Sequence, residues 1–335
     1  MGRNERLRSD DQYCRARAAR VRQGGKMNLQ PYLDFATEIA YRAGRITLGY
    51  FNAGVRPDYK ADDTPVTAAD RAAEEFIRAE IEKRYPTHAI LGEEFGETIR
   101  SSASPQTSVS ESVSPSASPL PSVPDSASPL HPLSNSASPL PSVPESASPF
   151  HPLSTSVPFR WIIDPIDGTK SFLRGVPLYG VLIGLEIEGV IQVGAAYFPG
   201  TDEMLCAAEG LGAWWNGRRA RVSEIGSFER AFICYTNVRN MEKYGRGAAW
   251  ERINAVAYAS RGWSDAYGYL CAATGRAEAM LDPVMNIWDC GPFPVIFKEA
   301  GGYFGSWDGR EGHTHNEALA CNAAIKDKLL EIIKG

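Results

Sequence analysis

The segment Trp161-Ile-Ile-Asp-Pro-Ile-Asp-Gly-Thr169 is the most informative part of the chain, because an apolar strand here runs into a charged turn. We expect the strand to end at Asp164, since the proline that follows has no N–H for the hydrogen-bond ladder. Asp167, Gly168 and Thr169 then look like the start of a helix. Two carboxylates this close repel each other unless a divalent cation holds them, and the N–H groups of Gly168 and Thr169 suit a phosphate oxygen. A turn residue at Asp164 and a helix cap at Asp167 explain the pattern equally well.

Three other acidic groups have similar surroundings. Glu93 and Glu94 follow an apolar pair, which places them at the end of a predicted strand. Asp70 lies where a polar loop runs into a predicted helix that Thr67 could cap, and Asp289 opens a later helical stretch. Taken singly, each has a structural explanation. The glutamates could be charged surface, and the aspartates could simply favour the positive end of a helix dipole.

Taken together and in order, these residues resemble the signature of the metal-dependent, lithium-sensitive phosphatases, the superfamily of inositol monophosphatases, fructose bisphosphatases and histidinol phosphatases. The chain matches it with Asp70, Glu93-Glu94, Asp164-Pro-Ile-Asp-Gly-Thr169, Trp288-Asp289 and Gly301-Gly302, with eleven residues between Asp289 and Gly301. The match covers 27–334 apart from a Ser/Pro-rich insert. It implies an α/β fold of layered α+β type, the αβαβα sandwich of the inositol monophosphatases and fructose bisphosphatases, with one long disordered insert.

The resemblance implies two or three Mg²⁺ ions as cofactor. Glu93, Asp164 and the Ile166 carbonyl would hold one ion, and Asp164, Asp167 and Asp289 would hold a second. Hard oxygen ligands without Cys or His are those that Mg²⁺ prefers. Two such ions can polarise a phosphoryl group and acidify the attacking water, so no phosphoenzyme is needed.

The same resemblance implies roles for the remaining site residues. Thr169 and Asp70 would orient or deprotonate the attacking water, and Glu93 would contribute to catalysis through its ion. The backbone of Gly168 and Thr169 would bind the phosphate. A hydrolase triad is disfavoured because the chain has no G-x-S-x-G motif.

The substrate prediction depends on Arg261, Asp265 and Asp282. Inositol monophosphatases usually carry a small or hydroxyl residue where Asp265 falls and a Glu at the Asp282 position. An acidic Asp265 suits a cationic substrate, and the Arg-Gly-aromatic-x-Asp pattern from Arg261 resembles the histidinol-phosphatase branch, although Asp265 could also be a helix cap. The loop of residues 60–70 looks equally like the branch that acts on adenosine 3′,5′-bisphosphate.

We therefore rank histidinol phosphate first, inositol phosphate second and the nucleotide third. A different class of protein, a catalytically silent scaffold, is disfavoured because a scaffold has no need to keep mutually repelling carboxylates. The expected partner is a small phosphorylated metabolite, and the family suggests a homodimer.

Composition limits the other classes of function. The chain has 335 residues, 43% of them hydrophobic, and a formal net charge of −5, which argues against a general binder of nucleic acid or membrane surfaces. It has neither a long apolar run nor a secretory leader, so we expect a cytoplasmic protein. The six cysteines are widely spaced and are expected to be buried free thiols.

The chain divides into parts that differ in amino-acid composition. Residues 1–26 form a basic segment, expected to be a disordered tail or sequence upstream of a start at Met27. Residues 101–158 are Ser/Pro-rich and contain a tandem repeat, in which Ser116–Asn135 recurs as Ser136–Thr155 with three differences. We expect this insert to be disordered, with its P-x-x-P matches as candidate docking motifs. Residues 27–100 and 159–222 are assigned to a metal-binding part and residues 223–335 to a substrate part.

Hydrophobic spacing predicts the main elements. Helices are expected at 27–51 and 67–85, an antiparallel meander at 179–222, and alternating strands and helices beyond it, with a single helix over 289–299. His313 and His315, in a polar Gly-rich loop, are expected to be surface residues rather than a metal pair.

Overall fold

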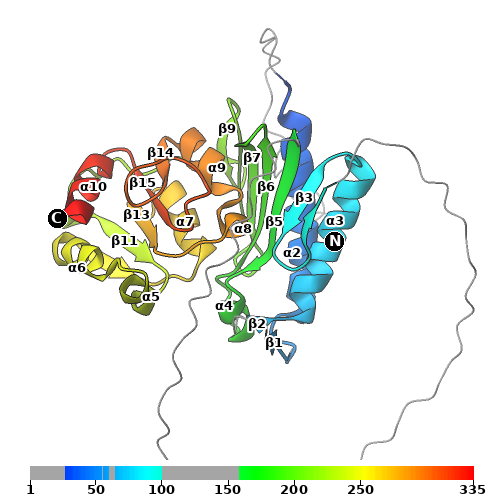
Figure 1. Ribbon diagram of the computed structural model, residues 1–335, viewed down its shortest axis with the longest axis horizontal. Coiled ribbons are helices and arrows are strands. Elements are labelled where there is room, and N and C mark those ends of the chain that lie inside the picture. The colour runs from blue at the N-terminus through cyan, green and yellow to red at the C-terminus, as the bar shows by residue number, and fades with distance from the viewer. Residues whose placement is uncertain (1–26, 55, 60–64, 100–157) are drawn as a thin grey trace, which may run out of the picture. The chain divides into compact units, whose positions relative to one another are not determined.

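The structure is a computed structural model that describes residues 27–54, 56–59, 65–99 and 158–335. The predictions for the basic segment, and for all of the Ser/Pro insert except Pro158, lie outside these residues. Two mixed sheets alternate with three layers of helices (Figure 1). This is the αβαβα sandwich that the resemblance implied.

The first sheet has eight strands in the order β10–β9–β8–β7–β6–β5–β3–β4. Only β3 and β5 run parallel, and β3 lies between β4 and β5. The strands of the first sheet are β3 (Ala89–Gly92), β4 (Gly96–Thr98), β5 (Phe159–Asp167), β6 (Gly180–Ile187), β7 (Val190–Phe198), β8 (Glu203–Ala208), β9 (Gly212–Trp215) and β10 (Arg218–Arg219). Strands β6 to β10 confirm the predicted meander.

Helices α2 (Gln30–Tyr50) and α3 (Ala68–Arg84) cover one face of this sheet, as Figure 1 shows in blue and cyan. Both confirm the predicted helices, although α2 begins at Gln30, where Pro31 suits the first turn. Their apolar faces pack in one core with β5 and β6 side chains such as Ile163 and Ile183. Two short strands, β1 (Asp58–Tyr59) and β2 (Pro65–Val66), pair between the helices.

The second sheet has five strands in the order β12–β11–β13–β15–β14. Its strands are β11 (Phe232–Tyr235), β12 (Ala259–Arg261), β13 (Ala279–Asp282), β14 (Gly302–Gly305) and β15 (Ala318–Asn322). Helices α7 (Ala266–Ala273), α8 (Ile287–Cys290) and α9 (Phe293–Ala300) lie between the two sheets, where they share one core with both. The short helix η2 (Phe228–Arg230) and helices α5 (Val238–Lys243), α6 (Gly247–Val256) and α10 (Lys326–Lys334) contribute to the core on the outer face.

Two element boundaries differ from the prediction. Strand β5 does not end at Asp164 but continues to Asp167, with a register shift between them. A proline is tolerated at such a bulge because the local ladder is already interrupted. The single helix predicted over 289–299 is two helices, α8 and α9, because Pro292 cannot donate the hydrogen bond that would continue α8.

A pair of glycines explains where that helix break lies. Gly184 on β6 and Gly194 on β7 are cross-strand partners. A Cβ added to Gly184 would overlap the backbone of Gly291, and one added to Gly194 would overlap that of Pro292. The two glycines therefore let the turn between α8 and α9 sit directly on the first sheet, and this contact brings α8 next to β5.

The first residues of β5 belong to a buried charge network. Arg160 Nη2 donates to Glu186 Oε2 at 2.8 Å, and His313 Nε2 lies 3.0 Å from the same oxygen. All three side chains are less than a tenth exposed, so the prediction that His313 is a surface residue was wrong. Burial alone would raise the pKa of Glu186, but the hydrogen bonds from His313 and Arg160 outweigh it and lower that pKa.

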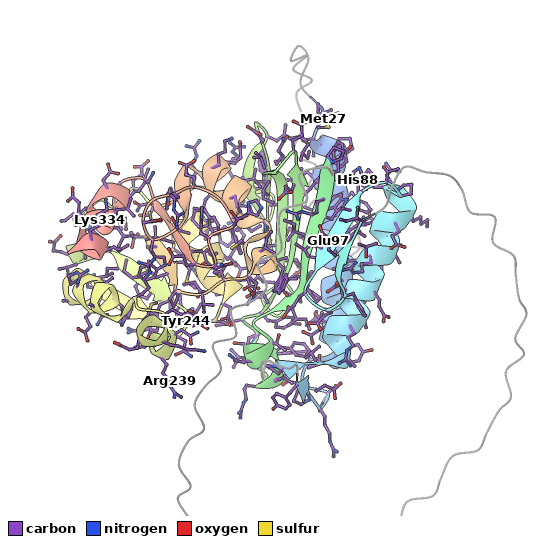
Figure 2. The ribbon with its side chains drawn as sticks, in the orientation of Figure 1. Met27, His88, Glu97, Arg239, Tyr244 and Lys334 are labelled. Atoms are coloured by element: carbon purple, nitrogen blue, oxygen red, sulfur yellow. The ribbon has the colours of Figure 1, made fainter. Side chains whose placement is uncertain are left out.

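His88, labelled in Figure 2, is a second buried histidine and contacts the aromatic residues of β5. Its Nδ1 accepts a hydrogen bond from Trp161 Nε1 at 3.0 Å, and its ring stacks on Phe159. Burial lowers the pKa of His88 to about 4. The imidazole is therefore neutral at ordinary pH.

Two compositional predictions can be compared with the described residues. Cys206, Cys234, Cys271, Cys290 and Cys321 are buried free thiols, as expected, and Cys14 lies outside the described range. Within that range, no helix is both long and apolar enough to cross a bilayer.

Candidate active site

A cavity of about 450 Å³ lies at the end of β5. Its wall includes residues from the first sheet, from helix α4 (Thr169–Leu173) and from the second sheet. Six carboxylates line it, those of Glu93, Asp164, Asp167, Asp265, Asp282 and Asp289. The sequence separates these residues by almost two hundred positions, and the fold brings them to one place.

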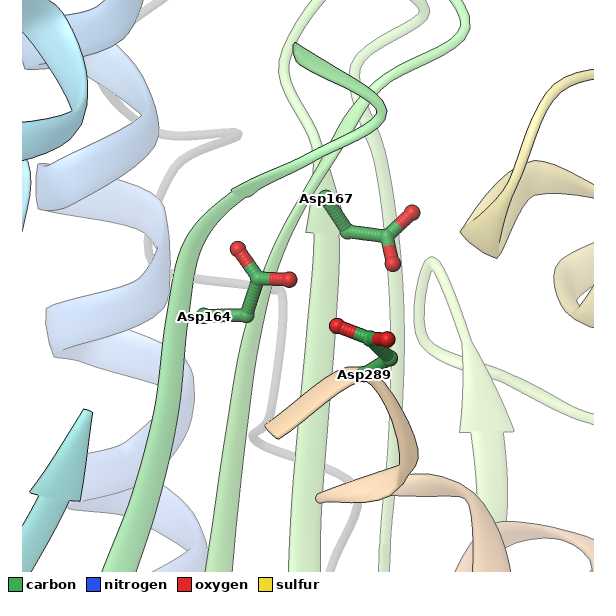
Figure 3. Close-up of side chains that lie close together, drawn as sticks. All are labelled: Asp164, Asp167 and Asp289. Carbon is green, nitrogen blue, oxygen red and sulfur yellow. The ribbon is translucent and has the colours of Figure 1, made fainter. Parts of the chain in front are cut away.

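Three of these carboxylates form a tight cluster. Asp164 and Asp167 from β5 and Asp289 from α8 each offer an oxygen within 4.8 Å of the other two, and Figure 3 shows the three groups pointing toward one another. Asp164 and Asp167 are buried and Asp289 is partly buried. We call this set the aspartate cluster.

Backbone donors orient each member of the aspartate cluster. The N–H of Ile166 donates to Asp164 Oδ1 at 3.0 Å. The N–H of Ala266, the first residue of α7, donates to Asp167 Oδ1 at 2.7 Å, and the N–H of Asn286 donates to Asp289 Oδ2 at 2.8 Å. Asp167 is thus not a helix cap, because its own helix is preceded by Gly168.

The electrostatics of the aspartate cluster fit a bound cation. Burial raises the pKa of Asp164 and of Asp167 well above the usual range and that of Asp289 to about 7, and neighbouring carboxylates add to each increase. Among the described residues, none of the three forms an ion pair with Lys, Arg or His. The donors are all oxygens, which suits a hard divalent cation such as Mg²⁺.

Glu93 and Ile166 lie where they could complete such a site. Both line the cavity, and the charge of Glu93 contributes to the raised pKa of Asp164 and of Asp289. The Ile166 carbonyl accepts a hydrogen bond from Thr169 Oγ1 at 3.1 Å.

Asp70 is placed differently. Its Oδ2 accepts hydrogen bonds from the Thr67 N–H at 2.8 Å and the Thr67 hydroxyl at 2.5 Å. The Ala69 N–H donates to Thr67 Oγ1 at 3.1 Å, which confirms the predicted cap of α3. Its Oδ1 is buried and has no hydrogen-bond partner among the described residues, and Asp70 is not part of the cavity wall. Burial, with smaller contributions from Glu94 and Glu93, raises the pKa of Asp70 to about 6. Its catalytic role stays a prediction.

Gly168 and Thr169 both line the cavity. Gly168 has φ +87°, a conformation that favours glycine, and a Cβ there would lie 3.2 Å from Ser264 Oγ and 3.3 Å from Asp265 Oδ2. Helix α4 has only five residues, so any phosphate contact here would come from individual N–H groups rather than from a long helix dipole.

The predicted substrate residues separate into two groups. Asp265 and Asp282 both line the cavity, and Asp282 Oδ1 accepts a hydrogen bond from Thr236 Oγ1 at 3.2 Å. Asp265 does occupy the N-cap position of α7, as the alternative expected, but its side chain makes no cap hydrogen bond. Arg261 is exposed, donates to the Ser260 carbonyl, and does not line the cavity.

Sequence reasoning missed several residues of the cavity wall, namely Lys170, Thr236, Asn237, Asn240 and Ser264. Lys170 directly follows the Asp-Pro-Ile-Asp-Gly-Thr motif, so its position was a usable signal. Thr236 and Asn237 follow β11, and nothing in their local sequence distinguishes them from ordinary loop residues.

Comparison with known proteins adds to this geometry. A histidinol-phosphatase from Chlorobaculum parvum is 34% identical over 307 residues, which cover 91% of this chain and 97% of that protein. Inositol monophosphatase 3 from Solanum lycopersicum is 27% identical over 91% of this chain and 97% of its own length. The solved structure of inositol monophosphatase from Anabaena (Nostoc) sp. PCC 7120 superposes with a TM-score of 0.66 at 25% identity, covering 92% of this chain and 97% of that one.

The model of the inositol monophosphatase family matches residues 28–115 and 144–334. These ranges contain every residue of the aspartate cluster and of the cavity wall. The chain therefore belongs to the inositol monophosphatase family of phosphatases.

Proposed function

We propose that this phosphatase is Mg²⁺-dependent and hydrolyses a small phosphate monoester that carries an amine, with L-histidinol phosphate as the best candidate. The observation that carries the proposal is the composition of one cavity. The aspartate cluster, whose oxygens could hold a cation, shares the cavity wall with Asp265, a further carboxylate that the cluster does not include.

The cation site would be made by Asp164, Asp167 and Asp289, with Glu93 and the Ile166 carbonyl completing it. A bound Mg²⁺ would polarise the phosphoryl group and lower the pKa of the attacking water. The protein would hold its own ligands in place through the N–H groups of Ile166, Ala266 and Asn286, so few side chains need to move when the ion binds.

Thr169 and Asp70 would position the attacking water. The Thr169 hydroxyl already donates its proton to the Ile166 carbonyl, so its oxygen can only accept, and a water that donates to it is held in one orientation. Asp70 is not part of the cavity wall; its carboxyl, with a pKa of about 6, is mostly ionised at neutral pH, and its Oδ1, which has no hydrogen-bond partner among the described residues, would accept the proton.

The choice of substrate is supported by Asp265. The electrostatic attraction between an ammonium group and a partly buried carboxylate is stronger than it would be in water, because the local dielectric is lower. The relative named histidinol-phosphatase, at 34% identity, points the same way. Inositol phosphate is the second candidate, since Thr236, Asn237 and Asn240 supply the hydroxyl and amide groups that suit a polyol.

The test is kcat/KM for histidinol phosphate, inositol 1-phosphate and adenosine 3′,5′-bisphosphate, measured side by side with Mg²⁺. We expect histidinol phosphate to be preferred. Asp265→Asn should lower kcat/KM for histidinol phosphate about tenfold, the effect of roughly 1.4 kcal/mol, and change that for inositol phosphate less than twofold. A clear preference of the unmodified enzyme for inositol phosphate would contradict the proposal.

A further inference from the structure

Lys170 occupies an unusual place in the candidate site. It is the second residue of α4, it lines the cavity, and its side chain is exposed. Among the described residues of the cavity wall it alone has a cationic side chain, whereas six of those residues are carboxylates. It makes no hydrogen bond or ion pair with any described residue, so its ammonium group is not committed to one position.

Helix α4 is held against the turn that carries Asp265. Ser171, the next residue, lies with its hydroxyl 2.7 Å from the Ser264 hydroxyl. Ser264 in turn contacts Asp265 Oδ2 at 3.4 Å and has φ +62°, which a serine rarely adopts without such support. Gly168 precedes Lys170 by two residues in the sequence, and a Cβ added to it would lie 3.3 Å from Asp265 Oδ2. The Asp265 carboxylate is therefore held beside the backbone that carries Lys170.

The two side chains also influence each other electrostatically. Burial raises the pKa of Asp265, and the positive charge of Lys170 is the largest influence that opposes this increase. Lys170 thus stabilises the ionised carboxylate when no ligand is present. Any ligand that brings its own cation to Asp265 must share the carboxylate with Lys170.

We propose that Lys170 competes with the cationic group of substrate and product for Asp265, and thereby sets the charge selectivity of the site and promotes release of an amine-bearing product. This inference deepens the proposed function and rests on it. The substrate is also anchored by its phosphate, so it tolerates the competition. The product alcohol has lost that anchor, and its amine alone must compete with Lys170 for the carboxylate.

The experiment measures binding rather than turnover. L-Histidinol and myo-inositol are titrated calorimetrically into the full chain with MgCl2, using Lys170→Gln, Lys170→Arg and the control Lys83→Gln, which removes an exposed charge from the last turn of α3. We expect Lys170→Gln to tighten histidinol binding about three- to tenfold relative to Lys83→Gln. Inositol binding should change less than twofold, and Lys170→Arg should bind both as the unmodified protein does.

A double variant tests whether Lys170 acts through Asp265. In an Asp265→Asn background, adding Lys170→Gln should no longer change histidinol binding, because the carboxylate for which the cations compete is gone. The inference would be overturned if Lys170→Gln still changed histidinol binding in the Asp265→Asn background, or if it changed the binding of both ligands equally. It would also be overturned if Lys170→Gln had no effect on histidinol binding, or if histidinol did not bind at all. If histidinol phosphate is not hydrolysed but the difference between the two ligands is found, the substrate proposal and the role in product release fail, while the competition between Lys170 and a bound amine for Asp265 stands.

Discussion

Strand β5 has a buried charge centre at each end, and the two differ in how their charges are compensated. At its start, Glu186 is paired with Arg160 and lies against His313, and its pKa is lowered. At its end, the aspartate cluster has no cationic partner among the described residues, and burial raises the pKa of Asp164 and Asp167. Glu186, Arg160 and His313 are all buried, as are Asp164 and Asp167, whereas Asp289 is partly buried.

From this difference we predict which charges serve the fold and which serve a ligand. A buried acid that already has its cation is part of the folded structure, and removing one partner leaves the other uncompensated. A group of buried acids without a cation destabilises the protein until something binds there. The first kind of centre should matter for stability and the second for activity, and variants at the two ends can separate these roles.

The largest effect is expected from Asp164→Asn, which removes a carboxylate at the centre of the aspartate cluster. Activity with Mg²⁺ should fall about a hundredfold or more, because several kcal/mol of transition-state stabilisation are lost with the ion. In a chelator, however, the melting temperature should rise rather than fall, since one of the repelling charges is gone. Asp34→Asn, the same change at an exposed position, is the control. A variant that retained more than a few per cent of the turnover would show that the cluster does not carry the reaction.

Glu186→Gln should have the opposite profile. It leaves Arg160 buried with no counter-charge at its closest partner, so the free energy of unfolding should decrease by about 3 kcal/mol, measured by urea denaturation. The activity of the folded fraction should stay within a few-fold. Glu209→Gln breaks an exposed ion pair with Lys298 and should cost less than about 1 kcal/mol. Equal losses from the two variants would remove the distinction between the buried and the exposed pair.

The third effect concerns pH and is confined to acid conditions. His88 has a pKa of about 4 in the folded protein, below its ordinary value of 6.5, so the unfolded chain takes up the proton first. Its contribution to stability is complete above pH 6.5 and is lost as the pH falls toward 4, by no more than about 3 kcal/mol. The aspartate cluster without metal has the opposite sign, because its pKa values are raised. His88→Asn should therefore flatten the decrease in stability between pH 6.5 and 4, followed in a chelator by urea denaturation; an unchanged slope would contradict the assignment.

Local patterns were enough to predict much of this molecule. The apolar spacing of α2 and α3, the cap formed by Thr67 and Asp70, and the meander from β6 to β10 all follow from residues close in sequence. The order of the acidic motifs indicated the family, and the structure brings most of those acids to one cavity.

What could not be predicted depends on distant partners. The break between α8 and α9 is seated on Gly184 and Gly194, which lie about a hundred residues earlier. His313 is buried where its ring contacts the carboxylate of Glu186, which lies 127 residues away in the sequence. Arg261 was expected in the site, but the end of β12 leaves its side chain exposed, and a sequence motif carries no information on that direction.

The arrangement of β3, β4 and β5 has a consequence for how this protein can evolve. Ile90 on β3 pairs with both Thr98 and Trp161, so the points where the chain leaves β4 and enters β5 are two strand spacings apart, about 10 Å. Doubling the segment that joins them changes the free energy of closing it by only about 0.6 kcal/mol. The junction lies at the end of β5 opposite the aspartate cluster. Tandem duplications can therefore accumulate there, or a foreign peptide be spliced in, without shifting the register of the strand that carries the acids.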